Sequence, residues 1–182
     1  MPSKSRKRLV IDASVARAAG GAEAVDPTSR RCRDFLLAVY KVCHRVVITP
    51  AIDREWKRHQ SRFARKWRRW MDGQKKVIHP DPAPSYDALY TSVERTAANV
   101  KDREAMYKDF CLIEAAMATD RIVVSRDDEA RDAFAKASAS VGELRTLVWV
   151  NPATVEEQEA ILWLEQGAPA ERSRQLGVWG EE

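Results

Sequence analysis

Four acidic residues of this 182-residue chain lie at positions where carboxylates often take part in catalysis. Two follow the end of a short apolar segment that reads as a buried strand. One lies in the second turn of the helix after another such strand, and one stands at the front of a further helix. Open α/β sheets bind their ligands just outside the carboxyl ends of their strands. We therefore expect these side chains to meet at one edge of one sheet. In chain order they are Asp12, Glu55, Asp109 and Asp127.

A cluster of four carboxylates favours one kind of chemistry. Such groups repel one another, so some hold protons unless a cation is present. A hard divalent cation such as Mg²⁺ or Mn²⁺ relieves the repulsion by taking oxygen ligands. The metal then lowers the pKa of a bound water and neutralises charge that builds on a phosphoryl oxygen. No Gly-rich phosphate loop, GxSxG or HExxH motif indicates another mechanism. We therefore predict metal-assisted phosphodiester hydrolysis, with all four acids as metal ligands and catalytic residues.

Each aspartate also has a plainer interpretation when it is taken alone. Asp109 is then a first-turn acid that the helix dipole favours, and Asp127 is an N-cap. Asp12 is harder to explain in this way, because an acid that ends an apolar strand tends to be partly buried. The order of the four acids after the strands favours the shared site.

Neighbouring polar residues extend this candidate site. Asp128 shares or replaces the role of Asp127. Glu114 is either a fifth acid at the rim or an ordinary surface glutamate. Ser14 and Ser125 either orient the carboxylates from behind them or serve as local caps.

The elements that position these residues alternate along the chain. Apolar segments bounded by turn residues predict strands at 8–12, 45–49, 121–125 and 144–150, and 77–79 is a further short segment that ends in a proline-rich loop. Helical periodicity predicts helices at 13–19, 29–43, 50–71, 85–106, 127–137 and 153–166, with one more opening at 108. This alternation predicts an α/β domain over 1–166, a three-layer α/β/α arrangement around a central, mostly parallel sheet. The tail, 167–182, is either loose or docked through Trp179.

The predicted helix 50–71 carries two stripes of side chains. One is apolar and contains three tryptophans, so we expect core packing or a dimer interface. The other is basic: residues 53–76 hold ten Lys and Arg against three acids, whereas residues 151–182 carry a net charge of −5. This asymmetry suits a polyanionic partner. The residues that we expect to contact RNA are Arg58, Arg62, Arg65 and Arg69.

The composition is that of an ordinary globular domain. Hydrophobic residues make up 45% of the chain and charged residues 32%. No apolar run approaches the length that spans a membrane, and we expect no secretory signal. The three cysteines show no disulfide or zinc spacing, and we expect Cys32 and Cys43 to pack in the core of a cytoplasmic protein.

Four stretches in this order resemble a PIN domain. They are VIDAS, ITPAIDREW, KDFCLIEAA and VVSRDDEARDAF, and the resemblance covers roughly residues 8–150. PIN domains form a family of metal-dependent ribonucleases that includes toxins of prokaryotic toxin–antitoxin pairs. The family's strand-ending aspartate and following hydroxyl match Asp12 and Ser14. Its second and third acids match Glu55 and Asp109, and its Ser/Thr-x-Asp pattern ends at Asp127.

The resemblance implies an endoribonuclease that uses Mg²⁺ or Mn²⁺, forms a homodimer and pairs with an antitoxin protein. An alternative is a non-catalytic PIN-like module that binds RNA or protein, although the four acids argue against it. A third interpretation is a metal enzyme for small phosphorylated substrates. The lack of a DxD pair at Asp12, where the second residue onward is Ser14, weakens that interpretation.

Overall fold

The protein has an α/β fold built on a five-stranded parallel sheet. The computed structural model describes residues 5–154 and 159–181. The strand order is β3-β2-β1-β4-β5, and every pair is parallel. The strands are β1 (Arg8–Ile11), β2 (Arg45–Val47), β3 (Val77–Ile78), β4 (Ile122–Val124) and β5 (Val148–Val150). This confirms the predicted fold class, and each strand is shorter than its apolar segment.

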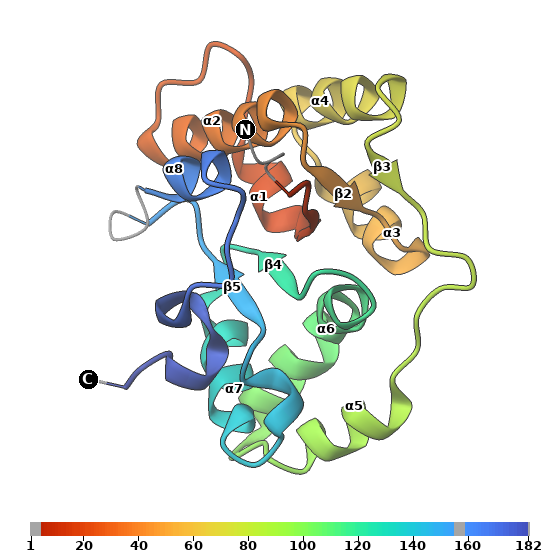
Figure 1. The fold of residues 1–182 in the computed structure, drawn as a ribbon, viewed down its shortest axis with the longest axis vertical. Helices are drawn as coiled ribbons and strands as arrows, with labels where there is room; N and C mark the ends of the chain where they lie inside the picture. The colour runs from red at the N-terminus through yellow and green to blue at the C-terminus, as the bar shows by residue number, and fades with distance from the viewer. Residues whose placement is uncertain (1–4, 155–158, 182) are drawn as a thin grey trace.

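Eight α-helices flank the sheet within the described residues. Helices α2, α4 and α8 lie on one side of it, and α5, α6 and α7 lie on the other (Figure 1). The helices are α1 (Ala13–Ala18), α2 (Pro27–Val42), α3 (Pro50–His59), α4 (Arg62–Gly73), α5 (Asp87–Glu94), α6 (Val100–Met117), α7 (Asp128–Ser138) and α8 (Ala160–Glu165). The expected helix 153–166 thus begins at Ala160 within the described residues; part of its expected span, 155–158, lies outside them.

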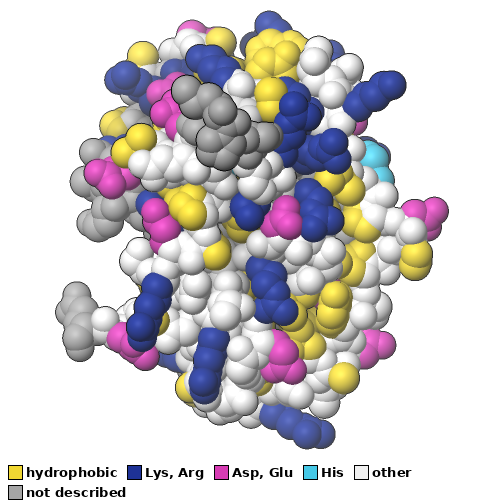
Figure 2. Space-filling view, in the orientation of Figure 1, with side chains coloured by type: hydrophobic (Ala, Val, Ile, Leu, Met, Phe, Trp, Pro, Cys, Tyr) yellow, Lys and Arg dark blue, Asp and Glu magenta, His cyan; other side chains and the backbone are white. Residues whose placement is uncertain are grey.

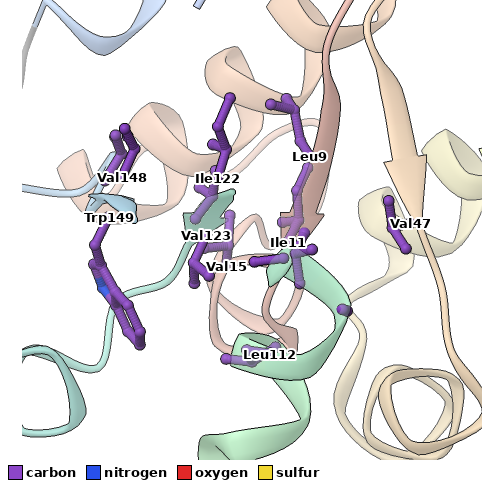
Figure 3. Packing of buried hydrophobic residues seen from close by; sticks show 14 of the residues in the cluster. Leu9, Ile11, Val15, Val47, Leu112, Ile122, Val123, Val148 and Trp149 are labelled. Carbon is purple, nitrogen blue, oxygen red and sulfur yellow. The ribbon is translucent and has the colours of Figure 1, made fainter. Parts of the chain in front are cut away.

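The core is the sheet together with the helix faces that cover it. Strands β1, β4 and β5 contribute fully buried side chains on both faces, as parallel strands covered on both sides must. Figure 3 shows Leu9, Ile11, Ile122 and Val123 side by side, with Leu112 of α6 packed beneath them. This burial fixes the position of α6 against the ends of β1 and β4.

The predicted helix 50–71 is two helices. Gln60 leaves the helical conformation with ψ at 138°, and Ser61 then caps α4 by accepting a hydrogen bond from the Ala64 amide at 3.1 Å. The break lets the backbone dock on α1: the Ser61 amide donates to the carbonyl of Ala16 and the Phe63 amide to that of Gly20. The single continuous basic stripe was therefore a wrong prediction, because its members belong to two helices.

The region before β4 also differs from the prediction. Instead of one helix over 85–106 and another opening at 108, α5 ends at Glu94 and α6 runs from Val100. Asn99 caps α6, accepting a hydrogen bond from the Asp102 amide at 2.8 Å. Asp109 consequently lies in the middle of a helix, not at its front.

Two smaller predictions are settled by the packing. Cys32 is buried as expected, but Cys43 is the left-handed C-cap of α2, with φ at 68°, and is partly exposed. The tail docks: the Trp179 indole donates to Asp132 at 2.6 Å, and the Arg131 guanidinium lies 3.4 Å from its ring centroid.

No helix among the described residues has the length and apolarity needed to cross a membrane.

The tryptophans of α3 and α4 belong to the core. Trp56 and Trp67 are fully buried and stack with their ring centroids 5.9 Å apart. The Trp56 indole donates a 2.8 Å hydrogen bond to the carbonyl of Ile11, the last residue of β1. This bond ties α3, which carries Glu55, to the strand end that carries Asp12.

We predict that Trp56→Phe destabilises the fold by about 1–3 kcal/mol, because it leaves the buried Ile11 carbonyl without this donor and leaves a void. Urea unfolding measures the loss. Trp70→Phe, at the partly exposed edge of the same cluster, is the matched control and should cost less. Equal losses in the two variants would contradict this role for Trp56.

Candidate active site

A pocket of about 620 Å³ opens where β1, α3 and α6 meet. Its wall combines three acids, three bases, one exposed tyrosine and an apolar floor. The lining residues are Asp12, Ala13, Ala51, Ile52, Arg54, Glu55, Arg58, Tyr107, Lys108, Asp109, Cys111 and Leu112. The structure thus brings three of the four predicted acids, Asp12, Glu55 and Asp109, to one cavity.

Asp12 is held by hydroxyl groups from the neighbouring strand end. The Ser125 hydroxyl donates to Asp12 Oδ2 at 2.9 Å, and the Ser125 oxygen accepts a hydrogen bond from the Asp127 amide at 3.1 Å. Ser14 lies 3.5 Å from the Ser125 hydroxyl and accepts from the Arg126 amide at 3.1 Å. Both serines therefore connect the end of β1 to the loop after β4, and Ser125 touches the carboxylate directly.

Asp109 is the most perturbed acid of the site. It is only 4% exposed, and its Oδ2 atom is buried without a hydrogen-bond partner. Burial and, next, the negative charge of Asp12 raise the pKa of Asp109 to about 7, although Lys108 opposes the shift. A carboxyl group in this setting keeps its proton to a higher pH than an ordinary aspartate does. Its orphan oxygen is a buried polar atom that a cation can satisfy.

Asp127 has two structural contacts. Its Oδ1 atom caps α7 by accepting a 2.9 Å hydrogen bond from the Ala130 amide. Its Oδ2 atom accepts from the Lys108 ammonium at 3.3 Å. Asp127 does not line the pocket, but its charge contributes to the raised pKa of Asp109. The N-cap interpretation is confirmed, and the residue also lies beside the acidic cluster.

Glu55 lies across the pocket on α3 and is half exposed. Its two carboxylate oxygens lie 3.6 Å from the Arg58 guanidinium and 3.6 Å from the His59 ring. Exposed contacts of this length hold a side chain weakly. Glu55 is therefore the acid of the pocket that is most free to reorient.

Asp128 and Glu114 have local structural partners. Both oxygens of Asp128 accept from the Asn151 side-chain amide, at 3.1 and 3.2 Å, which joins α7 to the end of β5. Glu114 Oε1 accepts a 3.0 Å hydrogen bond from the Tyr86 amide just before α5. Neither lines the pocket. Their carboxylates therefore serve to hold neighbouring elements in place.

The donor set suits a hard divalent cation. The pocket offers carboxylate oxygens, and burial together with the Asp109 charge raises the pKa of the Cys111 thiol to about 12, which leaves it a poor ligand. Among the described residues, no three His, Cys, Asp or Glu side chains lie close enough to hold a metal ion together. Mg²⁺ commonly keeps several waters and binds through one or two carboxylates plus substrate phosphates. Asp12 and Asp109 are two carboxylates that line one pocket.

Basic side chains surround the acids. Arg54 and Arg58 line the pocket from α3, and Lys108 lines it from α6. The remaining predicted RNA contacts, Arg62, Arg65 and Arg69, are exposed on α4 and do not line the pocket. Figure 2 shows Lys and Arg side chains gathered at the upper right of this face, on the side of α3 and α4.

Sequence reasoning missed Lys108 and Tyr107 as parts of the site and left Arg54 out of the expected contacts. The signal for α6 was present, because residues 108, 111 and 112 share one face of a continuous helix and Leu112 lies about one turn beyond Asp109. The prediction ended one helix at 106 and began the next at 108, so Tyr107 had no helical position. Arg54 lies one residue before Glu55 and reaches the pocket from the same turn.

Comparison with known proteins gives no match: no family model fits the sequence, and no curated protein or solved structure is significantly similar. The geometry of the site therefore has to carry the functional argument.

We predict that Asp109→Asn makes the metal-free protein more stable at pH 8 and leaves its stability at pH 4 nearly unchanged. The folded state keeps the Asp109 proton up to about pH 7, whereas the unfolded chain releases it near pH 4. The wild type therefore loses stability as pH rises between these values, by on the order of 3 kcal/mol, and the amide removes that loss.

Urea unfolding in EDTA across this pH range measures the effect. Glu104→Gln, which neutralises an exposed acid of the same helix, should keep the wild-type slope. A variant at Asp109 with the same pH dependence as the wild type would show that the carboxyl group is not held protonated.

Proposed function

We propose that this protein is a metal-dependent endoribonuclease that hydrolyses RNA phosphodiester bonds. The observation that carries the proposal is the buried Asp109 carboxyl with its unpartnered oxygen, placed beside Asp12 in a pocket rimmed by arginines. Burying such acids together costs free energy, and sites that bear this cost are often functional. A divalent cation offsets the cost, because its charge reverses the repulsion that raises the Asp109 pKa.

The residues of the pocket and their neighbours have separate roles in this proposal. Asp12 and Asp109 would hold Mg²⁺ or Mn²⁺, with Glu55 facing them across the pocket. When bound, the metal supplies a more acidic water and neutralises charge on the phosphoryl group. Ser125 fixes the orientation of Asp12 through its 2.9 Å hydrogen bond. Asp127 holds Lys108 at 3.3 Å.

Cations position the phosphate chain in this proposal. Arg54, Arg58 and Lys108 stand at the pocket, where a phosphate that approaches the acids needs counter-charge. The exposed arginines of α4 continue the positive surface beyond it. Arg58 lies within 3.6 Å of Glu55, so substrate phosphate competes with Glu55 for this guanidinium. Release of Glu55 toward the acids then accompanies substrate binding.

One observation favours a second candidate, a non-catalytic PIN-like module that binds RNA or protein. Asp127 and Glu55 already have partners, and the described acids form no three-ligand group. The arginine surface serves such a module equally well. Homodimer formation and an antitoxin partner remain predictions of the PIN resemblance, and a cytoplasmic location remains a prediction from the cysteines and the N-terminal sequence.

We predict that Asp12→Asn abolishes cleavage without unfolding the protein. The change removes a metal-binding oxygen but keeps the size of the side chain and an acceptor for Ser125. The assay is cleavage of labelled RNAs and single-stranded DNAs by purified protein in Mn²⁺ and in EDTA.

Asp128→Asn is the matched control for this test. It makes the same chemical change at a residue that does not line the pocket, and it should keep cleavage because Asp128 serves Asn151. Full activity in Asp12→Asn would remove the proposed site. Metal-independent RNA binding without any cleavage would favour the non-catalytic module.

We further predict that Arg62→Ala with Arg69→Ala weakens RNA binding and flattens its salt dependence. Removing two phosphate contacts lowers the slope of log affinity against log salt by roughly 1.4, at about 0.7 per contact for a single strand. Arg45→Ala with Arg172→Ala removes the same charge from exposed positions on other elements and should keep the slope. Identical slopes in both double variants would exclude α4 from the RNA path.

A further inference from the structure

Tyr107 stands out on the wall of the pocket. It lies on α6 beside Lys108 and Asp109, and it is 74% exposed although it is one of the largest apolar side chains of the chain. Figure 2 shows exposed hydrophobic side chains on this side of the molecule, near α6. Neither the core nor the proposed metal chemistry uses this ring.

The ring of Tyr107 is supported from one side. Its centroid lies 6.4 Å from that of Tyr90 in an edge-on contact at 67°, and Tyr90 in turn packs on Phe110 at 5.0 Å. Phe110 is buried, so the chain of three rings anchors Tyr107 to the core. A supported aromatic ring with most of its surface exposed is suited to stacking against a planar ligand.

The floor of the pocket points to the same kind of ligand. Ala51, Ile52 and Leu112 line it together with the acids and Tyr107. A phosphate group alone gains nothing from this apolar floor, whereas a nucleobase does. The volume of about 620 Å³ lies within the range of roughly 300–1,000 Å³ that holds small organic ligands. The arginines of α3 supply the positive charge that an attached phosphate needs.

We propose that Tyr107 forms a base-stacking subsite for the nucleotide next to the scissile phosphate. The proposal rests on the nuclease function proposed above and assigns it a specificity-determining residue. The base stacks on Tyr107 over the apolar floor, and its phosphate lies between the arginines of α3 and the pair Asp12 and Asp109. Purines stack over a larger area than pyrimidines, so the subsite favours a purine at this position.

The test uses short RNAs that carry one 2-aminopurine at successive positions. Binding is followed in EDTA by fluorescence anisotropy and by quenching of the 2-aminopurine, which reports stacking. Cleavage of the same RNAs is then measured in Mn²⁺. The variants are Tyr107→Ala, Tyr107→Phe and, as control, Val100→Ala, which truncates another exposed apolar residue of α6 that does not line the pocket.

We expect the wild type to quench 2-aminopurine at one position. Tyr107→Ala should lose this quenching, and its affinity should fall roughly 5- to 100-fold, the range that base–aromatic stacking supplies. KM should rise by a similar factor while kcat changes little. Tyr107→Phe and Val100→Ala should match the wild type, because the ring stacks without its hydroxyl group.

Three outcomes overturn the proposal in distinguishable ways. If the wild type cleaves RNA and requires Asp12, but Tyr107→Ala keeps its KM and quenching, the subsite is absent and the nuclease stands. If the wild type neither binds nor cleaves any RNA of the panel, the proposed function fails and the subsite fails with it. If Tyr107→Phe also loses binding, the base is held by a hydrogen bond from the tyrosine hydroxyl group and not by stacking.

Discussion

The pairing of β1 with β4 is the constraint on which the rest of the site depends. The two strands run parallel in register, with Ile11 opposite Val124, and the Asp12 amide donates to the Val124 carbonyl at 2.8 Å. This pairing brings Asp12 beside Ser125, which is 113 residues away in the chain. Parallel strands end at the same edge, so each side chain that follows β1 or β4 enters the same small region.

The second organising feature is the balance of charge around a buried carboxyl. Helix α6 places Asp109 against the strand ends, where burial and Asp12 raise its pKa to about 7. The same helix supplies Lys108, whose own pKa is raised chiefly by Asp109 and which contacts Asp127. The helix therefore carries both the perturbed acid and a cation that limits the perturbation. In the function that we propose, a metal ion or a substrate phosphate would relieve this unfavourable arrangement of charges.

Helix boundaries were the weakest part of the sequence-based prediction. The residues that end α3 and begin α4 are ordinary polar residues, and the apolar periodicity continues through them with little interruption. The break at Ser61 follows from hydrogen bonds to the backbone carbonyls of Ala16 in α1 and of Gly20 just after it, more than 40 residues earlier in the chain. Local propensity cannot report a partner so distant. The same limitation hid the true start of α6 at Val100 and with it the position of Tyr107.

The sequence by itself determined the parallel α/β class, the approximate place of every strand except β3 and the identity of three acids that share a pocket. It could do so because short continuous apolar runs and helices of period 3.6 are local patterns, and because strand ends in such sheets converge. The tertiary structure alone decided which acids are engaged elsewhere: Asp128 with Asn151, Glu114 with the Tyr86 amide, and Asp127 with the first turn of α7. It also decided the burial of Asp109. Burial and hydrogen-bond partners depend on contacts between distant segments, and these exist only once the chain has folded.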